Sequence, residues 1–159
     1  MLPRTYDNQN CSIARTLELV GERWTMLVLR ETFLGRGRRR FDEYAQALGI
    51  ARNVLSARLA HLVEEGVLDK VRYQERPERY EYRLTDKGLD LWPVLMALLH
   101  YGDRHYAPDG PPMLVTHRGC GGELTDRRMC ARCGAELTAA DVVAHAGPGA
   151  LSGAVAARV

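Results

Sequence analysis

The stretch from Asn53 to Gly88 has the most regular residue pattern in the chain and constrains the fold most. It begins with apolar residues at helical spacing, which are Leu55, Leu59, Leu62 and Val63. This spacing places them on one face of an α-helix. The opposite side carries small or polar residues: Asn53, Ala57, Ala60 and Glu64, with Arg52, Ser56 and His61 on its margins. We predict a helix with one buried face and one face that a partner can approach closely.

After Gly66 the pattern alternates between apolar and polar residues, which is typical of β-strands. The apolar positions of the two runs are Val71 and Tyr73, then Tyr80, Tyr82 and Leu84. Between the runs, Pro77 interrupts strand pairing and favours a turn. We therefore predict a two-stranded hairpin whose outward side is rich in Arg and Lys.

A helix followed by a basic hairpin is the order of elements in a winged helix-turn-helix. There the helix enters the major groove of DNA and the hairpin contacts the phosphate backbone. Arg and Asn, here at the start of the helix, pair bidentately with guanine and adenine. A solvated helix face and an ordinary charged hairpin are the plainer alternatives for each element alone. We interpret the two together as a DNA-binding surface.

The formal net charge is only +2, so DNA binding must come from local placement of charge. The densest basic cluster lies between Arg36 and Arg40, in a predicted loop before a supporting helix from Phe41 to Gly49. A solvated basic loop is the alternative. The candidate DNA-binding residues are Arg36, Arg38, Arg39, Arg40, Arg52, Asn53, Ser56, Ala57, Arg58, His61, Arg72, Arg76 and Arg79.

Three segments of the chain resemble the HxlR-type family of bacterial winged-helix regulators, which is related to the MarR group. They are Cys11 to Glu31, Arg39 to Leu68 and Arg76 to Gly88. The resemblance implies a dimeric regulator, more often a repressor, that binds a palindromic operator. The family usually has Ser at the start of the recognition helix, where this chain has Ala51. Alanine cannot cap a helix N-terminus, which costs about 1 kcal/mol.

Two further helices are predicted upstream, with Gly21 between them. The predicted inner residues of the first are Ile13, Leu17 and Val20, and those of the second are Trp24, Leu27, Val28 and Leu34.

A helix beginning near Thr85 is apolar on almost all sides between Leu89 and Leu99. One core covers only one face of a helix, so the other face needs a partner. We predict that this helix packs against its twin, and against the N-terminal helix, in a homodimer. Pro93 lies inside the pattern, and we expect one bent helix there. A cavity beside the dimerisation helices could hold a small-molecule effector.

The segment from His117 to Leu137 contains two knuckles, each a metal-ligand residue followed by two residues, a cysteine and a glycine. The candidate metal ligands are His117, Cys120, Cys130 and Cys133. One nitrogen and three sulfurs suit a structural zinc with no open coordination position. The alternatives are a redox dithiol, an incidental histidine, or a hairpin that has lost its metal.

Cys11 lies outside this cluster and matches the position that senses oxidants in several members of the family. The N-terminus of a helix stabilises negative charge, which favours the reactive thiolate. A small residue buried in the dimer interface is the equal alternative.

The predicted fold class is α+β: a winged helix-turn-helix with a long C-terminal dimerisation helix, followed by a small zinc-ribbon-like hairpin. The expected domains are residues 1–106, a ribbon over 107–146 and an Ala/Gly-rich tail over 147–159, with the tail composition beginning at Ala144.

No phosphate loop, nucleophile elbow or paired carboxylates indicate an enzyme. We expect a cytoplasmic, homodimeric, sequence-specific transcription regulator that binds double-stranded DNA, not a membrane, and responds to an oxidant, an electrophile or a small ligand. The alternative is a winged-helix scaffold that binds a protein partner through a metal-binding docking module.

Overall fold

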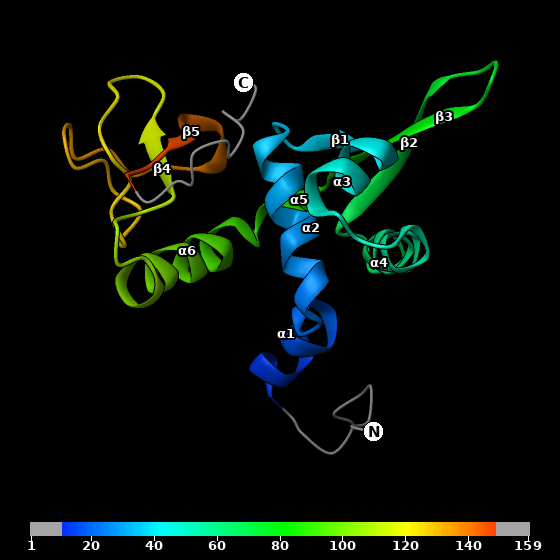
Figure 1. Ribbon diagram of the computed structural model, residues 1–159, viewed down its shortest axis with the longest axis horizontal. Coiled ribbons are helices and arrows are strands. Elements are labelled where there is room, and N and C mark those ends of the chain that lie inside the picture. Colours follow the sequence, from blue (N-terminus) through cyan, green and yellow to red (C-terminus); the bar gives the residue numbers. More distant parts are fainter. Residues whose placement is uncertain (1–10, 149–159) are drawn as a thin grey trace. The chain divides into compact units, whose positions relative to one another are not determined.

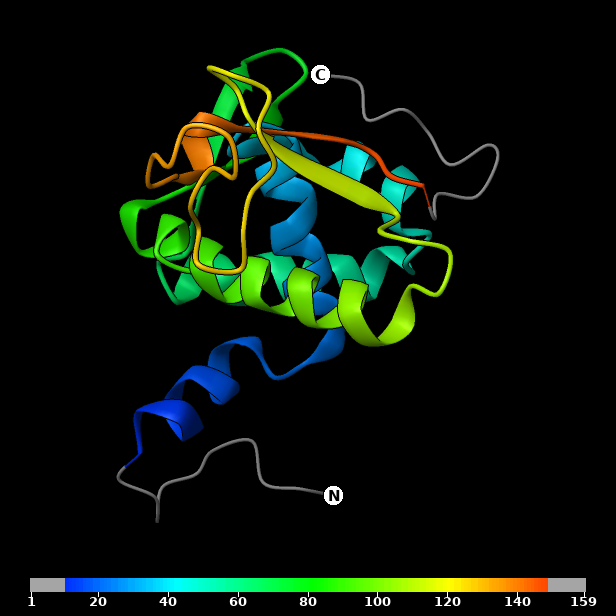
Figure 2. The same cartoon turned by 90° about the vertical axis from the view of Figure 1, so that its left-hand side faces the viewer.

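The computed structural model describes residues 11–148 of the chain, which divides after Gly88 into two compact units. Figure 1 shows the elements of both units, and Figure 2 shows them turned by 90°. Unit 1 contains α1 (Ser12–Val20), α2 (Arg23–Leu34), β1 (Arg38–Arg40), α3 (Phe41–Leu48), α4 (Arg52–Glu64), β2 (Leu68–Gln74), β3 (Arg79–Leu84) and most of α5 (Asp86–Leu89). Unit 2 contains α6 (Trp92–Tyr106), β4 (Met113–His117), a 3-10 turn (Ala139–Asp141) and β5 (Val142–Ala146).

The core of unit 1 forms where α4 packs against α2 and β2. Three leucines of α4, namely Leu55, Leu59 and Leu62, are completely buried, as the helical period predicted. Val63, the fourth predicted position, is half-buried. Helix α3 ends at Leu48, one residue before the predicted end, and Gly49 caps it in the left-handed conformation (φ 59°).

A buried hydrogen bond joins α2 to α3. The Thr32 hydroxyl donates to the Val28 carbonyl oxygen at 2.9 Å, so the Tyr44 hydroxyl donates to Thr32 at 2.6 Å. Burial raises the pKa of Tyr44, which keeps this side chain a neutral donor. The Tyr44 ring packs edge-on against Tyr82 of β3 at 6.2 Å between centroids. The pair fixes the sheet to the helices of unit 1.

The hairpin of unit 1 belongs to a three-stranded antiparallel sheet in the order β1-β3-β2. The prediction of a basic loop is wrong for residues 38–40, because they pair with β3 as strand β1. Three consecutive arginines carry no strand signal of their own; pairing with a distant strand decides their conformation.

The inner faces of the first two helices are also partly mispredicted. Ile13 and Leu17 are 71% and 48% exposed, whereas Ala14 and Val20 are buried. In α2 the fully buried positions include Thr25, Val28, Leu29 and Thr32. The other predicted positions, Trp24, Leu27 and Leu34, are only half-buried. The face of α1 that carries Ile13 and Leu17 is therefore left open in the protomer.

The single bent helix predicted around Pro93 is wrong: α5 ends at Leu89 and α6 begins at Trp92. Proline is tolerated in the first turn of a helix, because the N–H that it lacks would have no intrahelical acceptor there. Pro93 occupies such a position in α6. It marks the start of a helix and not a kink within one.

Unit 2 places a small ribbon beside α6, and the two views agree on this (Figures 1 and 2). Strands β4 and β5 pair antiparallel, and short bridges such as Thr116 with Glu123 and Leu124 with Cys130 extend the ribbon. Ala144 to Ala146, where the Ala/Gly-rich composition begins, belong to β5 and lie within the range predicted for the ribbon. Residues 149–159 of the expected tail lie outside the described residues. The boundary expected at residue 106 stays a prediction.

Candidate nucleic-acid interface and metal centre

Helix α4 turns a face of small and polar side chains to solvent. Asn53, Ser56, Ala57 and Ala60 are exposed, whereas Arg58 and His61 are half-buried. The N-cap residue Ala51 makes no side-chain hydrogen bond, as the sequence predicted. The first turn of α4 therefore offers its backbone and short side chains to a partner.

Arg52 at the start of α4 is 69% exposed and has two neighbours in unit 1. Its guanidinium pairs with Asp42 at 2.9 Å and lies over the Phe41 ring at 4.7 Å. An exposed ion pair is worth about 0–1 kcal/mol, so the pair with Asp42 does not prevent Arg52 from rearranging toward a ligand. The half-buried Arg58 approaches Glu22 at 3.9 Å.

Strand alternation divides the three arginines of β1 between the two faces of the sheet. Arg39 pairs in register with Tyr82, on the side that faces the core. There its guanidinium binds the buried carboxylate of Glu31 at 3.0 Å. Arg38 and Arg40 lie on the outer face, opposite Arg83 and Glu81. All three arginines were predicted to contact DNA. Arg39 instead forms an ion pair toward the interior, while Arg38 and Arg40 are exposed.

The hairpin carries the other predicted arginines. Arg72 pairs with Glu78 at 3.2 Å and approaches Glu75 at 3.9 Å, so part of its charge is compensated. Arg76 and Arg79 are exposed and have no carboxylate partner within residues 11–148. The same holds for Arg36, which has a positive φ of 59° in the turn before β1.

Two residues of this surface escaped prediction. Tyr73 holds the guanidinium of Arg40 at 4.4 Å from its ring centroid, and Arg83 lies opposite Arg38 across the sheet. Both residues belong to the alternating pattern from which the hairpin was predicted. Their role depends on the pairing of β1 with β3, which no local pattern indicates.

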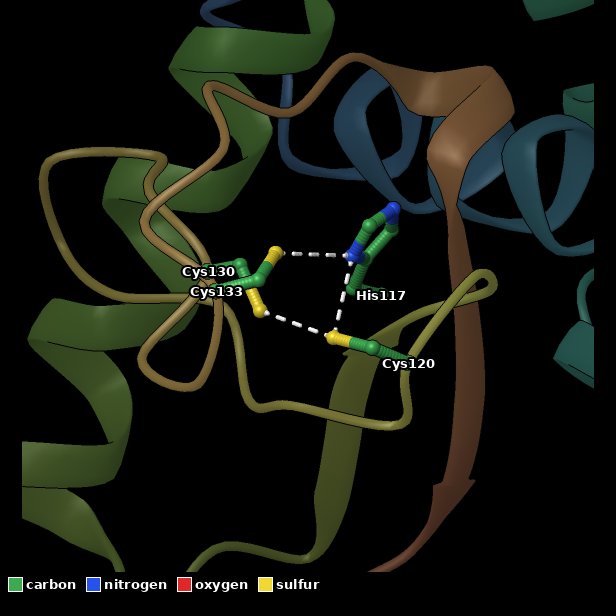
Figure 3. A group of neighbouring side chains, drawn as sticks. All are labelled: His117, Cys120, Cys130 and Cys133. Atoms are coloured by element: carbon green, nitrogen blue, oxygen red, sulfur yellow. Dashed lines mark hydrogen bonds between the residues drawn. The ribbon is translucent and has the colours of Figure 1, made fainter.

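The four predicted metal ligands come together at one end of the ribbon (Figure 3). Their ligand atoms all lie within 4.8 Å of one another. His117 Nδ1 is 3.2 Å from Cys120 Sγ and 3.5 Å from Cys133 Sγ, and the sulfurs of Cys120 and Cys130 are 3.3 Å apart. In a tetrahedral zinc site with Zn–S near 2.3 Å, sulfur atoms are about 3.8 Å apart. The donor set and its spacing fit such an ion, and the cluster could hold a metal.

Local backbone geometry turns the two knuckles toward each other. Gly121 and Gly134 follow the second ligand residue of each knuckle, Cys120 and Cys133, and both have a φ of 72°, which favours glycine. A side chain at Gly122 would lie 2.5 Å from Cys130 Sγ, so only glycine fits where the knuckles meet. Arg132 then donates to the Cys120 carbonyl oxygen at 2.8 Å and links one knuckle to the other.

The electrostatic surroundings of Cys130 favour the thiolate, the form that binds metal. The backbone N–H groups of Cys133 and Arg132 donate to its sulfur and lower the pKa of Cys130 to about 6. This sulfur is buried with its residue, which is 2% exposed.

Cys11 is the N-cap residue of α1 and is exposed in the protomer. It precedes the open face of Ile13 and Leu17 on the same helix. Burial of this thiol would require a partner.

The model of the HxlR-like helix-turn-helix family matches residues 19–109, more than half of the chain. The chain belongs to the HxlR family. Among curated relatives, an HTH-type transcriptional regulator of Mycobacterium tuberculosis is 49% identical over 139 residues, which cover 87% of each chain. The family match ends at residue 109, whereas this alignment contains 139 residues. The alignment therefore extends past residue 109 into the ribbon.

Solved structures support the same assignment. PA1607, a proposed transcription factor, is similar with a TM-score of 0.67 and 38% identity, covering 83% of this chain and 92% of its own. The redox regulator HypR in its oxidized form matches 60% of this chain and 97% of its own, with a TM-score of 0.55 and 25% identity. The family and these relatives are transcription regulators and not enzymes, and their winged-helix fold confirms the predicted α+β class. Within residues 11–148, no helix is both long and apolar enough to cross a membrane.

Proposed function

We propose that this HxlR-family regulator is a sequence-specific repressor that binds a palindromic operator as a homodimer in the cytoplasm. The observation that carries the proposal is the exposed face of α4, where Arg52, Asn53 and Ser56 stand beside two alanines. Small residues let the helix approach base edges, and Arg and Asn can read guanine and adenine there. Arg58 and His61 flank this face from half-buried positions.

The arginines outside α4 supply contacts to the DNA backbone. Exposed cations at Arg36, Arg38, Arg40, Arg76 and Arg79 have no competing carboxylate within the described part of the chain. Arg72 contributes after giving up its pair with Glu78, and Arg39 supports the strand from inside. Such contacts position the protein and make binding dependent on salt.

The test begins with a genome-wide pull-down of bound DNA to define an operator. Asn53→Ala and Arg52→Ala should each weaken operator binding by about 10- to 100-fold and relax sequence preference at one base pair. Arg127→Ala, which removes an exposed cation from the ribbon, is the control. Unchanged operator affinity in both α4 variants would refute direct readout by this helix. A promoter reporter that falls when the protein is supplied would support repression.

Dimerisation is supported by open apolar faces in both units. Val94, Leu98 and Tyr101 recur at helical spacing in α6 and are 39%, 52% and 57% exposed. Ile13 and Leu17 form a similar stripe on α1. Faces of this kind mark protein interfaces, and a two-fold dimer would set the recognition helices about 34 Å apart. Light scattering should show a dimer that Leu98→Asp converts to monomer, whereas Glu64→Ala should leave it intact.

The effector is proposed to be an oxidant or electrophile that reacts at Cys11, whose thiol is exposed in the protomer. Two Cys11 thiols from partner subunits would form a disulfide, giving two electrons and two protons to an oxidant such as diamide. Diamide should then release the operator from the wild type but not from Cys11→Ser. Equal operator affinity of both proteins with and without diamide would assign Cys11 to the interface alone. A small ligand of the dimer would be the remaining class of effector.

We also propose that the ribbon holds one structural zinc through His117, Cys120, Cys130 and Cys133. The support is the approach of one nitrogen and three sulfurs, with the His117 Nδ1 atom turned toward the sulfurs (Figure 3). Four protein ligands leave no position for a substrate, so the zinc would stabilise structure. Metal analysis of the purified protein should give one zinc per chain, and Cys130→Ser should abolish it. Cys11→Ser is the matched control and should keep the metal.

A further inference from the structure

A hollow of about 390 Å³ lies in unit 1 between the first turn of α3 and the hairpin. Its walls include Arg40, Phe41, Tyr73 and Arg79. We propose that this hollow seats one phosphate of the DNA backbone, between the guanidinium groups of Arg40 and Arg79. The proposal rests on the proposed DNA-binding function and adds a site to it.

The two cations in the hollow are available for an anion. Within residues 11–148 neither Arg40 nor Arg79 has a carboxylate within ion-pair distance. The Arg40 guanidinium lies 4.4 Å from the centroid of the Tyr73 ring. Contact with a ring face orients a guanidinium and leaves the N–H groups at its edge free to donate. Tyr73 therefore positions Arg40, and Arg79 supplies the opposing charge.

In the DNA-free protein, the two carboxylates that line the hollow have partners other than Arg40 and Arg79. Glu43 accepts the backbone N–H of Arg40 at 2.6 Å, which caps α3. Asp42 accepts from Arg52 at 2.9 Å. Neither carboxylate pairs with the guanidinium groups of Arg40 or Arg79, so the hollow keeps two donors for an incoming anion.

Charge on the neighbouring sheet adds to the attraction. Arg38 lies directly opposite Arg83 on the outer face of the sheet, an arrangement that destabilises a sheet in isolation. Glu81 compensates Arg83 at 2.7 Å but leaves Arg38 without a carboxylate partner in the described chain. A bound polyanion would relieve this repulsion.

The hollow also lies next to the helix proposed to read bases. Phe41 lines the hollow, and the same ring carries the guanidinium of Arg52, the first residue of α4, at 4.7 Å. A phosphate seated here would border the base pairs that the start of α4 contacts. The site would thus fix the register of α4 along the groove, which is the role of backbone contacts in general.

The test is the salt dependence of binding to a duplex of unrelated sequence, measured with the full chain. Each phosphate contact contributes about 0.9 to the slope of log affinity against log salt. Because both guanidinium groups contact the same phosphate, Arg79→Gln, Arg40→Gln and the double variant should each lower the slope by no more than about that amount. Arg40→Gln keeps the cap of α3, because the capping donor is the backbone N–H. Arg127→Gln removes an exposed charge from the ribbon and should leave the slope unchanged.

The positioning role of Tyr73 has its own pair of variants. Tyr73→Leu should reduce the slope nearly as much as Arg40→Gln, whereas Tyr73→Phe keeps the ring face and should behave as wild type. Circular dichroism and thermal unfolding would check that each variant is folded. A Tyr73→Leu slope equal to wild type would refute the positioning role.

Two outcomes separate this site from the general function. Slopes that are unchanged in Arg40→Gln and Arg79→Gln, with normal binding by the wild type, would overturn the hollow and leave DNA binding intact. A wild-type protein that binds no duplex DNA would overturn both. A third arm uses inorganic phosphate at constant ionic strength. Phosphate binding that Arg79→Gln abolishes, without a change in DNA slope, would assign the hollow to a free anion and also overturn the proposal.

Discussion

Unit 1 and the ribbon of unit 2 obtain their stability in different ways. Within residues 11–148, the largest fully buried side chains, including Tyr44, Leu55, Leu59 and Leu62, all belong to unit 1. The buried apolar residues of the ribbon are few: Val115, Leu124, Cys130 and Leu137. Short segments with so little apolar core usually need a metal or disulfides to fold. The comparison teaches that unit 1 has a large apolar core to stabilise it, whereas the ribbon has a small one and would depend on the proposed zinc.

Removal of the proposed zinc should have the largest effect on the difference between unit 1 and the ribbon. Binding free energies for structural zinc in small domains reach about 10–16 kcal/mol near neutral pH, and this energy is folding energy. A chelator, or Cys130→Ser, should therefore unfold the ribbon while unit 1 stays folded. Hydrogen exchange measured by segment would show protection lost around Leu124 and Leu137 and kept in α4.

The control for this experiment is Cys11→Ser, which removes a cysteine outside the cluster and should retain ribbon protection. Ribbon protection that survives complete removal of metal would contradict the assignment, because the small apolar core would then suffice.

The parts of the two units that could be predicted are those with local signals. Three buried leucines define α4 through a period, and two knuckles define the ribbon through spacing; neither needs knowledge of distant residues. The mispredicted parts depend on long-range partners. Residues 38–40, for example, form a strand only by pairing with β3.

The outer limits of helices were harder to predict for a different reason. Pro93 fits both a kink and the first turn of a new helix, and the pattern of apolar residues is the same in either case. On α1, Ile13 and Leu17 looked like core residues because apolarity indicates burial but not the partner that provides it. A subunit interface and a protomer core give the same sequence pattern.

A single substitution in the core of unit 1 should have a smaller effect on stability than removal of the proposed zinc. Leu59→Ala removes a completely buried side chain and should lower the free energy of unfolding of unit 1 by about 2–5 kcal/mol. Urea denaturation of zinc-loaded protein, followed by circular dichroism, would measure the loss. Zinc content should not change, because Leu59 lies in the other unit. Parallel losses of stability and zinc would mean that the two units fold as one.

Next in size is the hydrogen bond between α2 and α3. Because Tyr44 donates to Thr32, Tyr44→Phe leaves a buried hydroxyl without its donor and should cost about 1–3 kcal/mol. Tyr106→Phe, at a residue 77% exposed, is the matched control and should cost nothing measurable. Thermal unfolding of both variants provides the measurement. Equal midpoints for the two would show that solvent reaches the Thr32 hydroxyl.

The smallest expected change in stability within unit 1 lies at the start of α4, the proposed recognition helix. Ala51 is the N-cap of α4 with an extended backbone (ψ 134°), and its side chain accepts no hydrogen bond. A serine hydroxyl there can accept from a free N–H of the first turn, so Ala51→Ser should stabilise unit 1 by about 1 kcal/mol. Ala57→Ser, inside the same helix and equally exposed, should give no gain, because serine is a poorer helix former than alanine. Equal unfolding free energies for the two variants would show that capping does not limit this helix. A gain at Ala51 with unchanged operator affinity would show that a loose first turn is not needed for binding.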